Sequence, residues 1–374
     1  MHTRKPASPS KILCGIIFIF ILMVPKAMGA ENMQRDLRLT QKPLSDNPFG
    51  VLEFLNWNDS WNNHKYPDEK TIEKAVKLMR AAGIGMVRMD FLWSDIEPRQ
   101  GEFEFGKYDY IVDVLTKNKI AILGLLNYST PWAVANASWN CPPADNQLFV
   151  RYAVTVAIRY KDKIKYWEIW NEPDSYTYWA NQDGLKSYAV LLKDVYLAMK
   201  KALPDCIILN GGLANGISSV NSLYDNGAKD YFDILNVHIF VSPLYPGAIK
   251  RVSVFPKLAY KVMARNGDQD KKIWVTEIGC PGVKKGTEIG AWWLGENPDE
   301  EEQAEWVGSV FRELTRDERV EKIFWAFFRD CKDHWNNGVD YFGLLRWDFS
   351  QKPAFFSFRN SVRDWNKSRE RQIP

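Results

Sequence analysis

The sequence predicts a single (β/α)8 barrel, and three features of its pattern support this fold class. Segments typical of strands and of helices alternate along residues 49–364 with little interruption. Residues 120–126 form an unbroken apolar run of strand length, as expected for a parallel strand covered on both faces. No linker, repeat or low-complexity tract divides residues 30–374, so one domain is the simplest interpretation.

Eight segments have the apolar, β-branched and aromatic composition of strands. They cover residues 49–56, 86–91, 120–126, 164–170, 207–210, 234–240, 273–276 and 323–328. Eight strands, each followed by a helix, are the number that a closed barrel needs. A doubly wound open sheet is the alternative, but its usual signatures G-x-G-x-x-G, Walker A and G-x-S-x-G are missing from the sequence.

Helix-like segments separate these strands. The first covers residues 68–82 and places Ile72, Ala75, Val76 and Met79 at helical spacing. The remaining predicted helices cover residues 108–117, 147–160, 185–202, 219–227, 254–265, 300–316 and 353–364.

The N-terminal 29 residues have the layout of a secretory signal peptide. Basic residues precede an apolar run at residues 12–24, and small residues follow at 27–29. The apolar run is short for a membrane-spanning helix, although an uncleaved anchor is the alternative. We therefore expect residues 30–374 to form a secreted or periplasmic domain, with membrane attachment only if the leader is retained.

Charge and composition exclude some classes of partner. Four of the 49 basic residues lie in residues 1–29, which leaves 45 basic against 46 acidic residues and a net charge of −1. This balance gives no electrostatic reason to bind nucleic acid or anionic lipid. Aromatic residues make up 14% of the chain and include 16 tryptophans, which suits both a large core and sugar recognition. We expect a monomer.

Cysteine and histidine patterns give no indication of a metal centre. The chain has no CxxC motif, only four histidines and no His-x-His, so neither a structural zinc, a catalytic metal nor any other cofactor is expected. Four cysteines follow the leader, at Cys141, Cys206, Cys280 and Cys331. Because Cys280 and Cys331 follow neighbouring predicted strands at one end of the barrel, we expect a disulfide between them and a free Cys206.

Two strand-like segments end in a glutamate. Residues 166–173 read YWEIWNEP and place Glu172 at the carboxyl end of one predicted strand. Residues 273–279 read IWVTEIG and place Glu277 at the end of a later one. The active site of a (β/α)8 barrel lies at the face formed by the carboxyl ends of its strands. Two glutamates delivered by two strand ends are the groups that cleavage of a glycosidic bond requires.

Around these glutamates the sequence resembles clan A of the glycoside hydrolases, most closely family 39. Residues 171–173 (NEP) are similar to the acid/base motif of that clan, and residues 276–277 (TE) to its nucleophile motif. Residues 93–98 (WSDIEP) and 341–345 (YFGLL) also resemble this group. The resemblance covers nearly all of the chain after the leader.

The resemblance implies a retaining mechanism. Glu277 would attack the anomeric carbon as an ionised nucleophile, and Glu172 would donate a proton to the leaving oxygen. A nearby like charge and partial burial both raise the pKa of the acid. Retention predicts carboxyl groups about 5–5.5 Å apart, against about 6.5–9.5 Å for inversion.

Several further residues are expected to support the two glutamates. The clan pattern places Arg88 beside the nucleophile, although Arg88 could instead be the counter-ion of Glu168. By resemblance, Asn171 binds the sugar 2-hydroxyl. His238 lies where the clan often has His-x-Tyr, but here residues 238–240 read His-Ile-Phe. This change removes a phenol that often contacts the nucleophile, and Tyr245 is a candidate to replace it.

Tryptophans are the expected sugar-binding surfaces. Trp325, on the eighth predicted strand, is the candidate platform at the cleavage point. Other tryptophans follow strand ends and are candidates either for a substrate groove or for loop packing, namely Trp57, Trp132, Trp179, Trp292 and Trp293.

The sequence therefore predicts a retaining glycoside hydrolase that acts on an oligo- or polysaccharide. A single domain without an evident β-sandwich resembles the endo-acting family 39 enzymes that cut bacterial exopolysaccharides. An exo-β-glycosidase such as a β-xylosidase is the alternative within this class. A non-catalytic carbohydrate-binding barrel is the alternative outside it.

Overall fold

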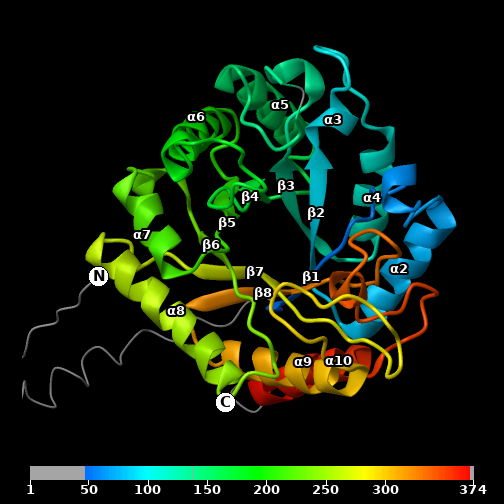
Figure 1. Ribbon diagram of the computed structural model, residues 1–374. Helices are drawn as coiled ribbons and strands as arrows, with labels where there is room; N and C mark the ends of the chain where they lie inside the picture. The colour runs from blue at the N-terminus through cyan, green and yellow to red at the C-terminus, as the bar shows by residue number, and fades with distance from the viewer. Residues whose placement is uncertain (1–46, 137, 371–374) are drawn as a thin grey trace, which may run out of the picture. The chain divides into compact units, whose positions relative to one another are not determined.

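The computed structural model describes residues 47–136 and 138–370, and the predicted leader lies outside the described residues. A ring of eight parallel strands lies at the centre and helices surround it (Figure 1). The predicted (β/α)8 barrel is therefore confirmed. In the described part of the chain, no helix is long and apolar enough to span a membrane.

Each predicted strand is present. They are β1 (Phe49–Leu52), β2 (Met86–Leu92), β3 (Ala121–Asn127), β4 (Tyr166–Asn171), β5 (Ile207–Gly212), β6 (Leu235–His238), β7 (Ile273–Ile278) and β8 (Val320–Ala326). Continuous parallel pairing runs in the order β5-β4-β3-β2-β1-β8-β7-β6. Two isolated parallel bridges, Leu209 with Ile234 and Leu213 with Val237, join β5 to β6 and close the ring.

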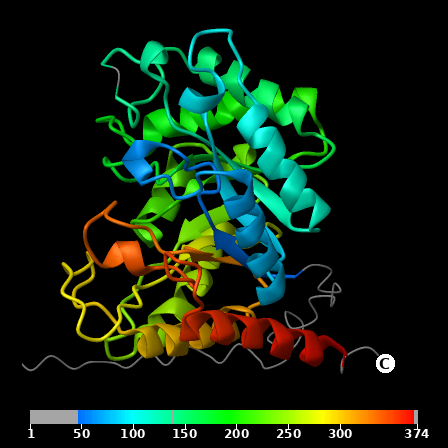
Figure 2. The ribbon, with the colours of Figure 1, turned by 90° about the vertical axis from the view of Figure 1, so that its right-hand side faces the viewer.

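The predicted helices are also present with different bounds, and the short helix α3 was not predicted. They are α2 (Glu69–Ala82), α3 (Trp93–Ile96), α4 (Gly106–Lys117), α5 (Asn146–Arg159), α6 (Leu185–Ala202), α7 (Ile217–Asp225), α8 (Ala248–Arg265), α9 (Glu300–Leu314) and α10 (Pro353–Glu370). Short 3-10 turns are η1 (Ser60–Asn62), η2 (Pro131–Ala133), η3 (Lys229–Tyr231) and η4 (Gly338–Tyr341). Helices α9 and α10 lie side by side along one edge (Figures 1 and 2).

Helix α2 shows how the local sequence sets an element. Asp68 caps its start by accepting a hydrogen bond from the Thr71 amide at 2.8 Å, and Gly83 ends it at a φ of 81°. The predicted apolar face is buried, since Ile72 and Met79 are at most 7% exposed. Helix α8 begins earlier than predicted, at Ala248, and it accommodates Pro256 in its interior.

The barrel interior changes from apolar to charged along the strands. Its lower layer is a separate apolar cluster made of Met86, Leu123, Leu209, Ile234, Trp274 and Phe324. Along β2 the inward positions that follow Met86 are Arg88 and Asp90, both almost fully buried. The apolar layer therefore supports a polar layer at the carboxyl ends of the strands.

The expected disulfide is wrong. Cys141, Cys206, Cys280 and Cys331 are all free thiols. Cys331 instead lies 3.4 Å from the ammonium of Lys65, which is fully buried and paired with Glu53 at 2.7 Å. Neighbouring strand ends thus bring the two cysteines to the same end of the barrel without joining them. Cys206 is free, as expected.

Candidate active site

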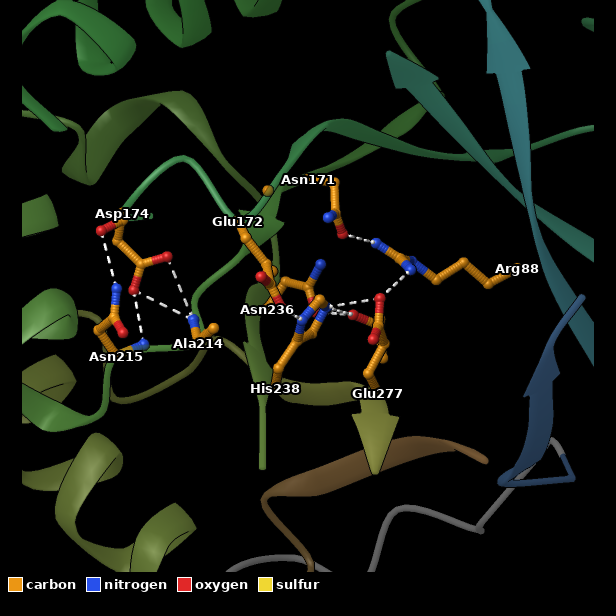
Figure 3. Close-up of polar contacts among 12 residues, drawn as sticks. Arg88, Asn171, Glu172, Asp174, Ala214, Asn215, Asn236, His238 and Glu277 are labelled. Carbon is orange, nitrogen blue, oxygen red and sulfur yellow. Dashed lines mark hydrogen bonds and ion pairs between the residues drawn. The ribbon is translucent and has the colours of Figure 1, made fainter. Parts of the chain in front are cut away.

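The end of β4 departs from regular strand alternation. Glu168 points into the barrel and is fully buried, whereas Trp170 packs edge-on against Trp179 with ring centroids 4.9 Å apart. Trp170 and Glu172 have φ angles of 70° and 44°, which a non-glycine residue rarely adopts. Because the chain turns at both positions, the neighbouring residues Asn171 and Glu172 both lie beside the same polar cluster (Figure 3).

Glu277 lies opposite Glu172 at the end of β7. A carboxylate oxygen of each, together with a ring nitrogen of His238, lies within 4.8 Å of the others. The pairing of β7 with β8 is irregular between Val275 and Ile278, and this bulge lets both Thr276 and Glu277 contact polar groups of the interior. The two predicted glutamates therefore meet across a short gap.

Arg88 joins the two strands that carry the acidic groups. Its Nη1 donates to Glu277 Oε1 at 2.7 Å, and its Nε donates to Glu168 Oε2 at 2.6 Å. Its Nη2 donates to Glu168 Oε1 at 2.9 Å and to Asn171 Oδ1 at 2.8 Å. Both roles considered for Arg88 are present, because one guanidinium serves the nucleophile candidate and the buried structural carboxylate.

His238 lies between the two carboxylates. Its Nδ1 is 2.8 Å from Glu172 Oε1, and its Nε2 is 3.1 Å from Thr276 Oγ1 and 3.7 Å from Glu277 Oε1. The ring fits closely against β5, since a Cβ added to Gly212 would lie 2.0 Å from Nε2. His238 therefore contacts the predicted acid directly.

Burial controls the proton affinity of the site. Removal from water raises the pKa of Glu172 to about 8, and the charge of Asp174 adds to this effect while Arg88 opposes it. Burial also raises the pKa of Glu277 from its ordinary value, while His238 and Arg88 lower it. Burial lowers the pKa of His238. These directions favour a protonated Glu172 beside a neutral imidazole.

The loop after β4 is fixed to the loop after β5. Asp174 accepts hydrogen bonds from the amides of Ala214 and Asn215, the second at 2.8 Å (Figure 3). The Asn215 side chain returns a bond to the Asp174 carbonyl at 2.8 Å. These bonds join the loop that begins at Glu172 to the loop after β5.

Two of the predicted sugar-binding tryptophans, Trp325 and Trp179, are buried in the protein. Trp325 is fully buried, and its indole donates to the Phe342 carbonyl at 2.9 Å. Its neighbour Phe324 belongs to the interior cluster, so strand alternation turns Trp325 towards the outer layer and leaves it no free face for a sugar. Trp179 is 1% exposed and donates to Ser187 at 2.9 Å, so it is a packing residue.

Tyr245 does not replace the missing phenol. Its hydroxyl donates to the Leu294 carbonyl at 2.7 Å, and its ring is 45% exposed. Trp132 is partly exposed, packs edge-on against Trp93, and donates to the Glu97 carbonyl at 2.9 Å. It therefore braces the loop after β3.

A different tyrosine lies near both carboxylates. Burial and the charges of Glu172 and Glu277 raise the pKa of Tyr178. Tyr178 stacks on Tyr128 at 6.2 Å, and the half-exposed Trp139 meets the Tyr128 ring edge-on at 4.8 Å. Tyr178 lies in an irregular loop, and no sequence pattern distinguishes it there. Asn236 could have been found, because it precedes His238 by two residues on the same strand face.

The acidic groups and His238 are close enough to chelate a cation, but their surroundings suit proton transfer better. Glu277 already binds the guanidinium of Arg88 at 2.7 Å, and a second cation beside it would be repelled. His238 has polar partners on both ring nitrogens within the protein. The donor set therefore fits an acid/base site.

Comparison with known proteins now gives the family. A model of the glycosyl hydrolase catalytic core matches residues 136–343, which is more than half of the chain. The chain belongs to the glycosyl hydrolase catalytic-core family. A β-galactosidase model matches residues 60–136 of this glycosyl hydrolase chain. The recognition of a glycoside hydrolase from its two glutamate motifs is thus confirmed.

Curated relatives match shorter segments. The chain is 37% identical over 87 residues to a β-galactosidase, BgaB, of Geobacillus sp. (strain Y412MC61), covering 22% of this chain and 13% of that protein. It is 32% identical over 124 residues to a 6-phospho-β-glucosidase of Clostridium longisporum, covering 30% of this chain and 24% of that protein.

Solved structures share the fold over most of the chain. A family 39 glycoside hydrolase from Bacteroides cellulosilyticus WH2 aligns with a TM-score of 0.65 and 22% identity, covering 85% of this chain and 63% of that one. The exo-β-1,4-mannosidase Op5Man5 from Opitutaceae bacterium strain TAV5 aligns with a TM-score of 0.62 and 16% identity, covering 86% and 60%. This chain thus spans less than two thirds of these relatives.

Proposed function

We propose that this chain is a retaining glycoside hydrolase with Glu277 as nucleophile and Glu172 as acid/base. The observation that carries this proposal is the spacing of the two carboxylates, which have oxygens within 4.8 Å of one another. Retaining enzymes use a short separation of about 5–5.5 Å, because the nucleophile itself attacks the sugar. Inverting enzymes leave a gap of about 6.5–9.5 Å for a water molecule.

The charges around the pair support these roles. Arg88 places a fixed positive charge 2.7 Å from Glu277, and this favours the ionised form that a nucleophile needs. Burial keeps the proton on Glu172. Because Asn171 Oδ1 accepts from Arg88, the amide nitrogen of Asn171 is the group left to donate to a sugar hydroxyl.

Product stereochemistry and two variants test the mechanism. Proton NMR of the first product should show the anomeric configuration of the substrate. Glu277→Gln should abolish hydrolysis of every substrate. Glu172→Gln should abolish hydrolysis of natural glycosides, retain polysaccharide binding, and still release an activated aryl leaving group, which needs no acid. Inversion, or unchanged hydrolysis after Glu172→Gln, contradicts the assignment.

For the substrate, we propose a β-linked polysaccharide cut within the chain. The curated relatives named above are all β-glycosidases by description. Half-exposed tryptophans follow β1, β3 and β7, namely Trp61, Trp139 and Trp293. Aromatic surfaces in three sectors of the barrel mouth suit a long ligand, since each ring offers an apolar face to a pyranose. They take the place of the buried Trp57, Trp179 and Trp292.

The size of the products separates internal cutting from trimming. A panel of oligo- and polysaccharides should give intermediate oligomers first if the enzyme cuts internally. Monosaccharide from the earliest time would instead support the alternative, an exo-β-glycosidase.

Trp139→Ala tests the role of the exposed tryptophans, and it should raise KM for polysaccharide and not for a small aryl glycoside. Phe356→Ala, on the exposed face of α10, is the matched control for loss of a surface aromatic side chain. A non-catalytic sugar-binding barrel would bind the polysaccharide and release nothing.

We propose further that the enzyme acts outside the cytoplasm, on the strength of the leader-like composition of residues 1–29. Mass spectrometry of the exported protein should give an N-terminus near residue 30. A full-length chain in the membrane fraction would indicate a retained anchor.

A further inference from the structure

A row of hydrogen bonds extends from the proposed acid through the barrel interior to β5, the strand next to β4. From the end of β4 it passes to β6, then to β7, back to β6 and finally to β5. Its members are Glu172, His238, Thr276, Asn236 and Asn210. Apart from Glu172, all of these side chains are at most 2% exposed, so water does not compete for their bonds.

At the far end of the row, the side-chain amides of Asn210 and Asn236 can take only one orientation. Asn210 Oδ1 accepts from the backbone amide of Asn236 at 2.9 Å, and Asn210 Nδ2 donates to the Asn236 carbonyl at 3.0 Å. The Asn236 side chain faces the Asn210 carbonyl at 3.1 Å, and a carbonyl can only accept. The atom that faces it is therefore Nδ2, and Asn236 Oδ1 faces Thr276.

This orientation commits the hydroxyl of Thr276. Thr276 Oγ1 lies 2.6 Å from Asn236 Oδ1, which can only accept, so the threonine proton is donated there. Towards His238 Nε2, at 3.1 Å, the same oxygen must act as acceptor. Nε2 of His238 is therefore the nitrogen that carries a hydrogen.

The consequence reaches the proposed acid. A neutral imidazole with hydrogen on Nε2 has a lone pair on Nδ1. Nδ1 lies 2.8 Å from Glu172 Oε1, so the hydrogen between them belongs to the carboxyl group. Deprotonated Glu172 would instead face that lone pair with a negative charge.

We propose that Thr276 and Asn236 are positioning residues that fix the tautomer of His238 and thereby keep Glu172 protonated between catalytic cycles. This inference rests on the proposed function, because it assigns Glu172 as the acid. A ring turned by 180° would lose the contacts of Nδ1 with Glu172 at 2.8 Å and of Nε2 with Thr276 at 3.1 Å, so these partners hold the ring in the observed arrangement.

The charges facing His238 come from three strands and one loop. Arg88 on β2 opposes a proton on the imidazole, and burial acts in the same direction. Carboxylates that favour such a proton are Glu277 on β7, Glu168 on β4 and Asp174 on the loop after β4. Burial has the largest effect, and the pKa of His238 is lowered.

The fixed tautomer serves both steps of the reaction. In the first, the glycosidic C–O bond breaks, Glu277 bonds to the anomeric carbon, and the Glu172 proton passes to the leaving oxygen. In the second, water oxygen bonds to that carbon, Glu277 leaves as a carboxylate, and one water proton returns to Glu172. A carboxylate that faces the Nδ1 lone pair is a stronger base for this return.

Thr276→Val tests the inference, because valine keeps the shape of threonine and removes the oxygen. His238 should then place its hydrogen on Nδ1 and donate it to Glu172, which makes Glu172 a stronger acid. The alkaline limb of the kcat/KM profile should move to lower pH by about one unit. At pH values above that limb, kcat/KM should therefore be roughly tenfold lower than in the wild type. Thr276→Ser should return the alkaline limb to its wild-type pH, since serine keeps the hydroxyl.

Nitrogen NMR of the wild-type protein gives a test that needs neither a substrate nor a variant of the site. The four histidines can be told apart with His64→Gln and His334→Gln, which lie outside the row. The His238 signal should show hydrogen on Nε2 and none on Nδ1. Hydrogen on Nδ1, or an alkaline limb that Thr276→Val leaves in place, overturns the inference. If the wild type cleaves no glycoside, the proposed function fails while the NMR result still decides the tautomer.

Discussion

Arg88 binds Glu277 at 2.7 Å through one nitrogen of a guanidinium whose other nitrogens bind Glu168 and Asn171. Arg88 is 1% exposed, so these bonds form in a region that excludes water. The position of Glu277, the proposed nucleophile, is thereby set by a residue on another strand of the barrel mouth.

Arg88→Lys should retain the positive charge and lose most of the activity. A lysine ammonium is compact and cannot reach Glu168, Asn171 and Glu277 together, as the planar guanidinium does. We expect kcat to fall roughly 100-fold, the size of effect that a small misplacement of a reacting group can have. Steady-state kinetics on an aryl glycoside measures it. Arg99→Lys, in an exposed pair with Glu102, is the control and should leave kcat unchanged.

The rate should depend on pH with a bell-shaped profile. Glu172 must be protonated to act as acid, and its pKa of about 8 places the alkaline limb near pH 8. Glu277 must be ionised, and burial raises its pKa, so the acidic limb should lie above the range of an ordinary glutamate. The two limbs belong to the coupled pair. Glu172→Gln should remove the alkaline limb for an activated aryl substrate, and its persistence would contradict the assignment.

Glu172→Gln should also change how stability depends on pH. The folded-state pKa of about 8 lies above the value of about 4.3 in the unfolded chain, so the folded protein binds more protons between these two values. Stability due to Glu172 is therefore complete at low pH and is lost as pH rises towards 8, by about 1.4 kcal/mol per unit.

A glutamine cannot lose a proton, so the variant should gain Tm relative to the wild type from pH 5 to pH 8. Thermal unfolding followed by circular dichroism measures this difference. Glu305→Gln, on the exposed side of α9, is the control for removing one carboxylate charge. A Tm difference for Glu172→Gln that is constant with pH would show that Glu172 is not held protonated.

Gly212→Ala should disable the site while the barrel still forms. The added Cβ would lie 2.0 Å from His238 Nε2 and 2.4 Å from its Cδ2, and the buried ring has no free space to enter. We expect a loss of about 1–3 kcal/mol of stability, as for other overpacked cores, and at least a tenfold loss of kcat. Gly106→Ala, at the open start of α4, is the matched control and should retain both.

The fold could be predicted because its signals are local. The apolar run that became β3 and the helical spacing of Ile72 to Met79 in α2 are written in short segments of sequence. Glu172 and Glu277 could be found because a strand end in a parallel barrel has one location. Arg88 followed from the resemblance to clan A.

The sugar-binding residues could not be predicted with the same success. Trp325 was expected in the site, but strand alternation from Phe324 turns it outward. The position of Tyr178 depends on the path of an irregular loop after Glu172. That loop has no helical or strand periodicity from which its path could be predicted. The wrongly expected disulfide between Cys280 and Cys331 shows the same limit of prediction from strand order. Two side chains at one end of a barrel need not be within bonding distance.

The junction of β5 and β6, the only pair of neighbouring strands in the described barrel joined by isolated bridges alone, lies at the far end of the row of hydrogen bonds that begins at Glu172. Strands β5 and β6 are joined by isolated bridges, and the amides of Asn210 and Asn236 span the junction. Gentle heating that loosens this junction would release the amide that orients Thr276 before the remaining strands separate. Catalysis should then fade several degrees below global melting, with inactivation that reverses on cooling.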